Sequence, residues 1–191
     1  MSTYKQSLLP DAKPIVVCKF PNMGPELKSN KAKLIQAGIH RHISEERRVL
    51  FLVMAMMETD HLAERERDKR KDKCIDGTAN ASIFNVNQSM LRALGYLDNI
   101  RKLDSHSRLG DVMALLNKGI NHLGGVSSLL DYHRGGETTF KDHTSYLAAE
   151  YRNGVASALA AIDANNDLIT NEFRIWMDIP YVNNKVPCKE R

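Results

Sequence analysis

Hydrophobic residues are most concentrated at positions 49–57, where apolar side chains occupy nearly every place. An α-helix that is apolar on all sides has to be surrounded by protein. Ser44 is suited to cap such a helix, and Glu45 and Glu46 follow in the first turn, where the helix dipole favours acidic side chains. The pattern therefore predicts a buried central helix that begins after Ser44 and carries Glu58 near its C-terminal end.

Helical spacing recurs along most of the remaining chain, and alternating apolar and polar positions are scarce. Residues 1–30 are rich in proline and turn formers and contain one strand-like run, 15–20, so we expect an N-terminal arm that lies on the domain. Helices are expected in four further segments: 30–42, a helix that begins near Asn87, 111–125, and 144–162. The pattern favours a single mostly α (α+β) domain over residues 1–191.

Two other segments carry clear local signals. Residues 126–137 read as a short helix or an extended turn that breaks at Gly135 and Gly136. In the closing segment, Phe173 and Trp176 are expected to anchor the chain to the core.

Composition narrows the class of protein. The 191 residues suit one domain, with 42% hydrophobic and 26% charged residues. No stretch approaches the roughly 18 uninterrupted apolar residues of a membrane span, so we expect no membrane association. The net charge of +4 comes from basic residues mixed with acids, without the interleaved aromatics of a nucleic-acid surface. We therefore expect no nucleic-acid partner.

The cysteines and the N-terminus leave alternatives open. Three cysteines, Cys18, Cys74 and Cys188, exclude a full disulfide framework, and no CxxC pair is present. Either Cys18 pairs with Cys188 and Cys74 stays free, or all three are free thiols. The first 17 residues lack the layout of a signal peptide, which fits an intracellular start or a mature chain with an added Met.

Glu58 is the first candidate for chemistry. A carboxyl group at the end of an apolar helix loses solvation, which raises its pKa and favours the protonated form that a general acid needs. Glycoside hydrolysis pairs such an acid with a second carboxylate. The highly charged stretch that follows offers three partners, Asp68, Asp72 and Asp76, and no spacing rule chooses among them. The alternative is a Glu58 side chain that points into water.

The segment 131–137, with the sequence DYHRGGE, is the second polar cluster. His133 and Arg134 precede paired glycines, which allow a close approach of the backbone to a ligand. A capped helix end is the alternative interpretation. The spacing of His, Asp and Glu residues does not make a metal site, and no nucleotide-binding fingerprint is present, so we expect neither metal nor cofactor.

Three blocks in the same order resemble a known family. They are MAMMET with the later GTANASIFNVNQSML, then YHRGGE, and finally LITNEFRIWMDI, and the similarity around them runs from about residue 45 to residue 179. These blocks resemble the lysozyme-like endo-β-1,4-mannanases of glycoside hydrolase family 134. The resemblance implies a lysozyme-like fold, in which a helical domain and a small irregular or β lobe enclose a cleft.

The resemblance also implies roles for particular residues. Glu58 would be the general acid and Asp72 the general base, with Asp76 as the alternative base, in an inverting hydrolysis of β-1,4 bonds. The sugar cleft would be lined by Asn80, Asn87, His133, Arg134 and Glu137. The chain departs from the family in a longer and more charged loop between Glu58 and Asp72, and in ASIF at 81–84, which would alter the cleft wall.

We therefore expect a secreted, monomeric hydrolase, its signal peptide removed, acting on a polysaccharide, with mannan as the first choice. The alternatives are a lysozyme- or chitosanase-type hydrolase of aminosugar polymers and a secreted non-catalytic interaction protein on the same scaffold. Aromatic platforms for sugar rings could come from Tyr96, Tyr132, Tyr146 or Trp176, although the low aromatic content of 6% limits them.

Overall fold

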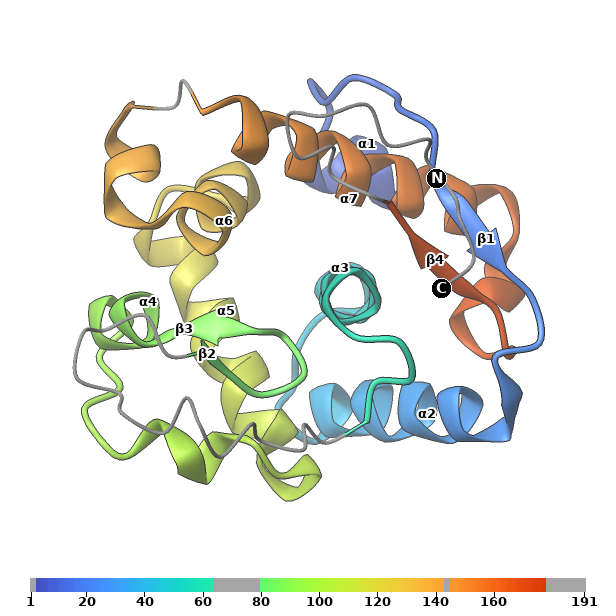
Figure 1. Ribbon diagram of the computed structural model, residues 1–191, viewed down its shortest axis with the longest axis horizontal. Coiled ribbons are helices and arrows are strands. Elements are labelled where there is room, and N and C mark those ends of the chain that lie inside the picture. The colour runs from blue at the N-terminus through green and yellow to red at the C-terminus, as the bar shows by residue number, and fades with distance from the viewer. Residues whose placement is uncertain (1–2, 64–79, 143–144, 178–191) are drawn as a thin grey trace.

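The computed structural model describes residues 3–63, 80–142 and 145–177. Helix α3 (Glu45–Glu58) lies at the centre of the molecule and is seen end-on in Figure 1, with the other elements around it. All of residues 49–57 are buried. The predicted central helix is therefore confirmed, and Glu58 is its last residue.

One side of α3 is covered by elements from both ends of the described chain (Figure 1). They are α1 (Tyr4–Leu8), β1 (Cys18–Phe20), α7 (Tyr146–Ala164), the 3₁₀ turn η4 (Asn166–Ile169) and β4 (Arg174–Trp176). Strands β1 and β4 pair antiparallel with Cys18 opposite Trp176, and the rings of Phe20 and Trp176 lie 6.1 Å apart. Cys18 is disulfide-bonded, and the other two cysteines lie outside the described residues.

The opposite side is built from the middle of the chain. Its elements are β2 (Asn80–Ala81), β3 (Val86–Asn87), α4 (Gln88–Ala93), the 3₁₀ turns η2 (Ile100–Leu103) and η3 (His106–Arg108), α5 (Leu109–His122) and α6 (Val126–Asp142). Strands β2 and β3 form a small hairpin. Helix α2 (Gly24–His40) packs against both α3 and α5 and so joins the two sides.

Most predicted elements are present, with shifted ends. The mostly helical class with little β structure is confirmed. The helix expected at 30–42 begins at Gly24 instead, because Pro25 is well tolerated in the first turn of a helix. The N-terminal arm is correspondingly shorter than residues 1–30. The helix expected to begin near Asn87 is α4, which Asn87 caps, and α6 is interrupted at Gly136.

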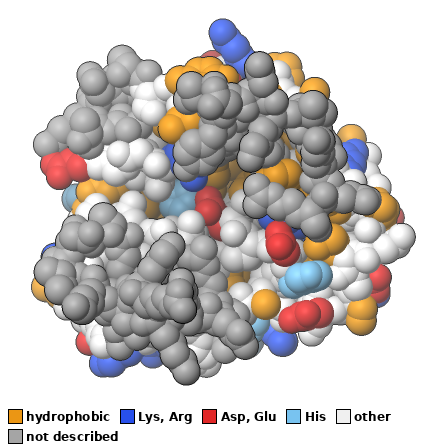
Figure 2. All heavy atoms as spheres, viewed as in Figure 1, with side chains coloured by type: hydrophobic (Ala, Val, Ile, Leu, Met, Phe, Trp, Pro, Cys, Tyr) orange, Lys and Arg blue, Asp and Glu red, His pale blue; other side chains and the backbone are white. Residues whose placement is uncertain are grey.

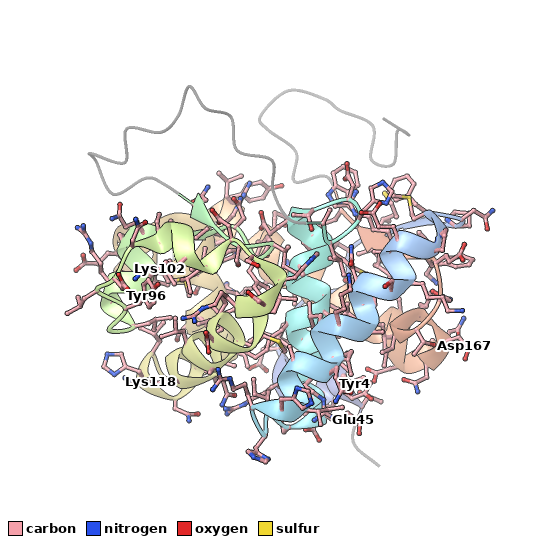
Figure 3. All side chains as sticks on the ribbon, turned by 90° about the horizontal axis from the view of Figure 1, so that it is seen from below. Tyr4, Glu45, Tyr96, Lys102, Lys118 and Asp167 are labelled. Carbon is pink, nitrogen blue, oxygen red and sulfur yellow. The ribbon has the colours of Figure 1, made fainter. Side chains whose placement is uncertain are left out.

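Polar contacts fasten the outer elements to the centre. The Tyr4 hydroxyl donates to Glu45 Oε1 at 2.5 Å, and both lie at the same end of the molecule in Figure 3. Lys31 of α2 is fully buried, and its Nζ donates to the carbonyl oxygens of Leu168 at 2.7 Å and Phe173 at 2.6 Å. Within the described ranges, no helix has both the length and the apolar character needed to span a membrane.

Candidate active site

A cleft of about 360 Å³ opens where the C-terminal end of α3 meets the β2–β3 hairpin and α6. Its described lining is almost entirely polar and consists of Glu58, Asn80, Asn85, Asn87, Ser89, His133, Arg134, Gly135 and Gly136. In Figure 2, histidine, acidic and basic side chains meet in a hollow near the middle of this face. The cleft thus combines one carboxylate with several groups able to hydrogen-bond a hydroxyl-rich ligand.

Glu58 lies at the base of this cleft with a side chain that is only 9% exposed. Asn85 Nδ2 donates to Glu58 Oε2 at 2.9 Å, and His133 Nε2 lies 3.2 Å from Oε1. The Tyr151 hydroxyl is close enough to the carboxyl group for each to shift the pKa of the other, although it makes no hydrogen bond of normal geometry. Each carboxyl oxygen of Glu58 therefore has its own nitrogen partner.

These partners reverse the pKa shift expected from burial. Burial raises the pKa of Glu58, but the hydrogen bond and electrostatic attraction of His133, together with Asn85 and Tyr151, outweigh it and leave the pKa below its ordinary value. The prediction of a raised pKa at Glu58 is therefore wrong. The prediction considered only the lost solvation, and the compensating groups come from distant parts of the sequence.

The β2–β3 hairpin positions Asn85. The turn residues Ile83 and Phe84 are buried, and the Phe84 ring packs edge-on against Phe51 of α3 with 6.3 Å between ring centroids. Asn85 follows in the left-handed region at φ 53°, a conformation that asparagine tolerates better than most residues. Because the apolar pair is anchored in the core, the Asn85 side chain is held toward Glu58.

The two strands of the hairpin contribute the other asparagines. Asn80 and Asn87 are opposite each other in the strand register, and both line the cleft. Asn87 also caps α4, since its Oδ1 accepts from the backbone N–H of Met90 at 2.7 Å. The segment 81–84, expected to form part of the cleft wall, is buried instead.

Helix α6 supplies the opposite wall. Asp131 is buried and paired with Arg152 of α7, which fixes the helix directly before His133. At Gly136 the backbone has φ 69° and ψ −164°, a region that is essentially restricted to glycine. The resulting break turns the chain along the cleft and leaves the half-buried Arg134 in its lining.

The structure brings together four of the five residues predicted to line the cleft, namely Asn80, Asn87, His133 and Arg134. Glu137 lies just beyond Gly136 with an exposed side chain, and it is not among the described lining residues. Both candidate bases, Asp72 and Asp76, lie outside the described residues.

Sequence reasoning missed Asn85 and Ser89. A signal was present, because Asn85 directly follows the apolar pair Ile83 and Phe84 in a segment full of small polar residues. Such a pair marks a point where the chain enters the core, and its polar neighbour is therefore held in a defined position.

The aromatic candidates lie elsewhere. Tyr132 is buried and Tyr146 is exposed; Tyr96 donates to the backbone oxygen of Asn99 and Trp176 packs on Phe20, and none of the four is part of the described lining. Among the residues that the structure describes, no three His, Cys, Asp or Glu side chains are grouped so that they could hold a metal ion. The described lining offers hydrogen-bond donors and acceptors together with one carboxyl group, Glu58, that can transfer a proton.

No protein-family model matches the chain, and no curated protein is significantly similar to it.

Proposed function

We propose that this protein is an inverting, endo-acting glycoside hydrolase that cleaves a β-1,4-linked polysaccharide, with mannan as its substrate. The observation that carries the proposal is the buried Glu58 at the base of a polar cleft, with a hydrogen-bond partner on each carboxyl oxygen. The resemblance to the lysozyme-like mannanases supplies the reaction type. The proposal includes a lysozyme-like fold and a secreted, monomeric protein.

In this mechanism Glu58 is the general acid. It protonates the oxygen of the leaving sugar and becomes a carboxylate, which Asn85 and His133 stabilise through their N–H groups. Because the pKa of Glu58 is lowered, its protonated form is populated at acidic pH, and activity should be highest there. Asp72 is proposed as the base that activates water, with Asp76 as the alternative.

The lining favours a neutral or anionic polymer. Asn80, Asn85 and Asn87 offer both amide donors and carbonyl acceptors, which match sugar hydroxyl groups. Arg134 adds a permanent positive charge to the same cleft and so disfavours the protonated amines of chitosan. Chitin and peptidoglycan remain the competing substrates, and the binding protein without activity is the competing function.

The test is a panel of purified polymers in which mannan, chitin, chitosan and peptidoglycan are incubated with the wild-type protein and with Glu58→Gln. We expect mannan to be cleaved by the wild type only. A dinitrophenyl mannooligosaccharide should remain a substrate of Glu58→Gln, because this leaving group departs without protonation. NMR of the first product should show the inverted anomer.

The base is assigned by comparing Asp72→Asn with Asp76→Asn, of which only the first should be inactive on every substrate. Cleavage of an aminosugar polymer and not of mannan would show that the aminosugar polymer is the substrate. A wild type that cleaves no polymer but binds one would favour the interaction protein, and full activity of Glu58→Gln would overturn the role of Glu58.

A further inference from the structure

Asn85 and His133 approach Glu58 from different elements and bind different oxygens of its carboxyl group. Asn85 lies in the β2–β3 turn and donates to Oε2 at 2.9 Å, whereas His133 lies on α6 with Nε2 3.2 Å from Oε1. The histidine side chain is 2% exposed, so water cannot replace it as a donor. The two contacts fix both the position and the orientation of the carboxyl plane.

We propose, on the basis of the proposed function, that Asn85 and His133 are positioning residues. They form a pair of fixed N–H donors that stabilise the Glu58 carboxylate formed on proton transfer. In this way they set the pH limit of catalysis, which is the pH above which activity falls. Neither residue delivers the proton. Glu58 donates it to the leaving oxygen, and the O–H bond of the carboxyl group breaks as the glycosidic oxygen gains its proton. The donors then hold the negative charge that remains on Glu58.

The surroundings of His133 indicate how it acts. Its Nδ1 is buried without a partner among the described residues, and a proton there would lack an acceptor. The ring proton that meets an acceptor is therefore the one on Nε2, directed at Glu58. The Tyr151 ring packs behind His133 with 5.4 Å between centroids and closes the histidine off from the side of α7.

Among the described residues, the other charged groups near Glu58 have partners of their own. Arg134 of α6 lies over the Tyr151 ring at 6.0 Å. From the direction of β4, Arg174 donates to the carbonyl oxygen of Met56 at 2.9 Å and is paired with Asp60. Tyr151 itself has a pKa raised well above its ordinary value by burial and by the charge of Glu58, so it stays neutral.

The test measures kcat/KM against pH for the wild type, Asn85→Gly, Asn85→Asp, His133→Leu and His133→Gln. Glycine suits the left-handed backbone at position 85, so Asn85→Gly removes the donor without straining the turn. Loss of a donor favours protonated Glu58, and the pH at which activity falls should therefore move upward, by about one pH unit in Asn85→Gly and in His133→Leu. Asn85→Asp should move it further, because a second carboxylate opposes ionisation.

His133→Gln is the conservative variant, since its amide can donate to Oε1 as a neutral group. It should keep the pH limit closer to the wild-type value than His133→Leu does. Asn80→Ala is the matched control, because Asn80 lines the same cleft without a recorded bond to Glu58. It should change KM and leave the pH limit in place.

Carboxyl ¹³C NMR of Glu58, assigned with Glu58→Gln, reads the same titration without substrate. An upward-shifted titration in Asn85→Gly supports the proposal even if His133→Leu does not fold. If the titration of Glu58 and the pH limit are both unchanged in Asn85→Gly, the positioning role is overturned, but the proposed glycosidase activity is not affected. A wild type without hydrolytic activity would overturn the proposed function, and with it the catalytic meaning of the two donors.

Discussion

Lys31 and Glu58 are both ionisable groups inside the protein, and the pKa of each is below its ordinary value, yet for opposite reasons. Burial lowers the pKa of Lys31 to about 8, and the two carbonyl oxygens that accept from it carry no full negative charge. At Glu58 burial acts in the raising direction, and the donors His133 and Asn85 overcome it. The environment of Lys31 therefore shifts its equilibrium toward the neutral form, although the amine is still mainly protonated at pH 7, whereas the environment of Glu58 shifts that group toward its charged form.

The difference reflects what each group does. Lys31 connects α2 to Leu168 in η4 and to Phe173 directly before β4. Its amine donates to the carbonyl oxygens of both residues, which would otherwise be buried without partners. Glu58 faces a cleft, and its surroundings stabilise the charge that follows proton donation. Burial by itself thus does not identify a functional acid; the partners and the adjoining cleft do.

The largest expected effect is on turnover in Glu58→Gln. Loss of the general acid should lower kcat on polymer by at least about 100-fold. The glutamine has the same shape as the glutamate and can still accept from one of the two donors through its amide oxygen, so the far-ultraviolet circular dichroism should match that of the wild type. Turnover of the polymer within tenfold of the wild-type rate would show that Glu58 is not the general acid.

The stability of the same variant should depend on pH. The folded state lowers the pKa of Glu58, so ionised Glu58 contributes stability above the unfolded value near 4.5, and this contribution is lost as the pH falls through the folded value. Thermal unfolding should show the wild type more stable than Glu58→Gln at pH 7, with the gap closing on acidification. A gap that widens at low pH would contradict the lowered pKa.

Lys31→Met should affect folding and leave chemistry unchanged. The substitution leaves the carbonyl oxygens of Leu168 and Phe173 without a donor, which should cost about 2 kcal/mol in the free energy of unfolding. Urea denaturation measures this loss, and kcat should stay at the wild-type value. A large drop in kcat with normal stability would place Lys31 in the functional part of the molecule.

Alkaline pH should widen the difference in the free energy of unfolding between the wild type and Lys31→Met. Between about 8 and 10.5 the unfolded chain binds the proton on Lys31 more tightly than the folded chain does. Deprotonation therefore removes the cost of burying the charge, and the stability of the wild type should rise relative to Lys31→Met across this range. Parallel pH profiles for the two proteins would show that Lys31 keeps an ordinary pKa.

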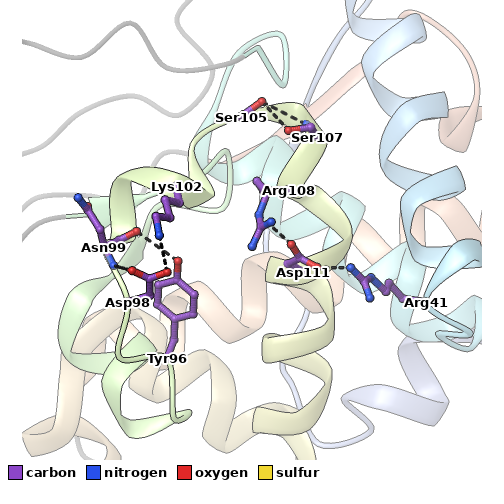
Figure 4. A network of polar contacts seen from close by, with 9 residues as sticks. All are labelled: Arg41, Tyr96, Asp98, Asn99, Lys102, Ser105, Ser107, Arg108 and Asp111. Atoms are coloured by element: carbon purple, nitrogen blue, oxygen red, sulfur yellow. Dashed lines mark hydrogen bonds and ion pairs between the residues drawn. The ribbon is translucent and has the colours of Figure 1, made fainter.

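The smallest effect is expected at the exposed pair of Asp98 and Lys102, shown in Figure 4. The amine and the carboxylate lie 2.7 Å apart, with side chains 60% and 57% exposed for Lys102 and Asp98 respectively. Exposed pairs of this kind are screened by water and salt. Lys102→Met should leave the unfolding temperature unchanged at physiological salt. A clear decrease would show that this exposed pair also contributes to stability, as the buried charged groups do.

Local patterns in the sequence were sufficient to predict several features. The run of apolar residues at 49–57 predicted the buried helix α3, and the helix expected to begin near Asn87 is α4. The break at Gly136 followed from paired glycines, which permit backbone angles that other residues rarely adopt. Each of these features depends on residues that are near neighbours along the chain.

Tertiary structure decided the environment of Glu58. Asn85 is 27 residues away in the chain and His133 is 75 residues away, and neither could be assigned to a particular carboxyl oxygen from spacing. The direction of the pKa shift depends on the sum of burial and these distant donors, so it could not be obtained from the apolar helix alone. The sequence by itself determined where an acid meets the end of the central helix, and only the packing of α6 and the hairpin around it decided in which charge state that acid is held.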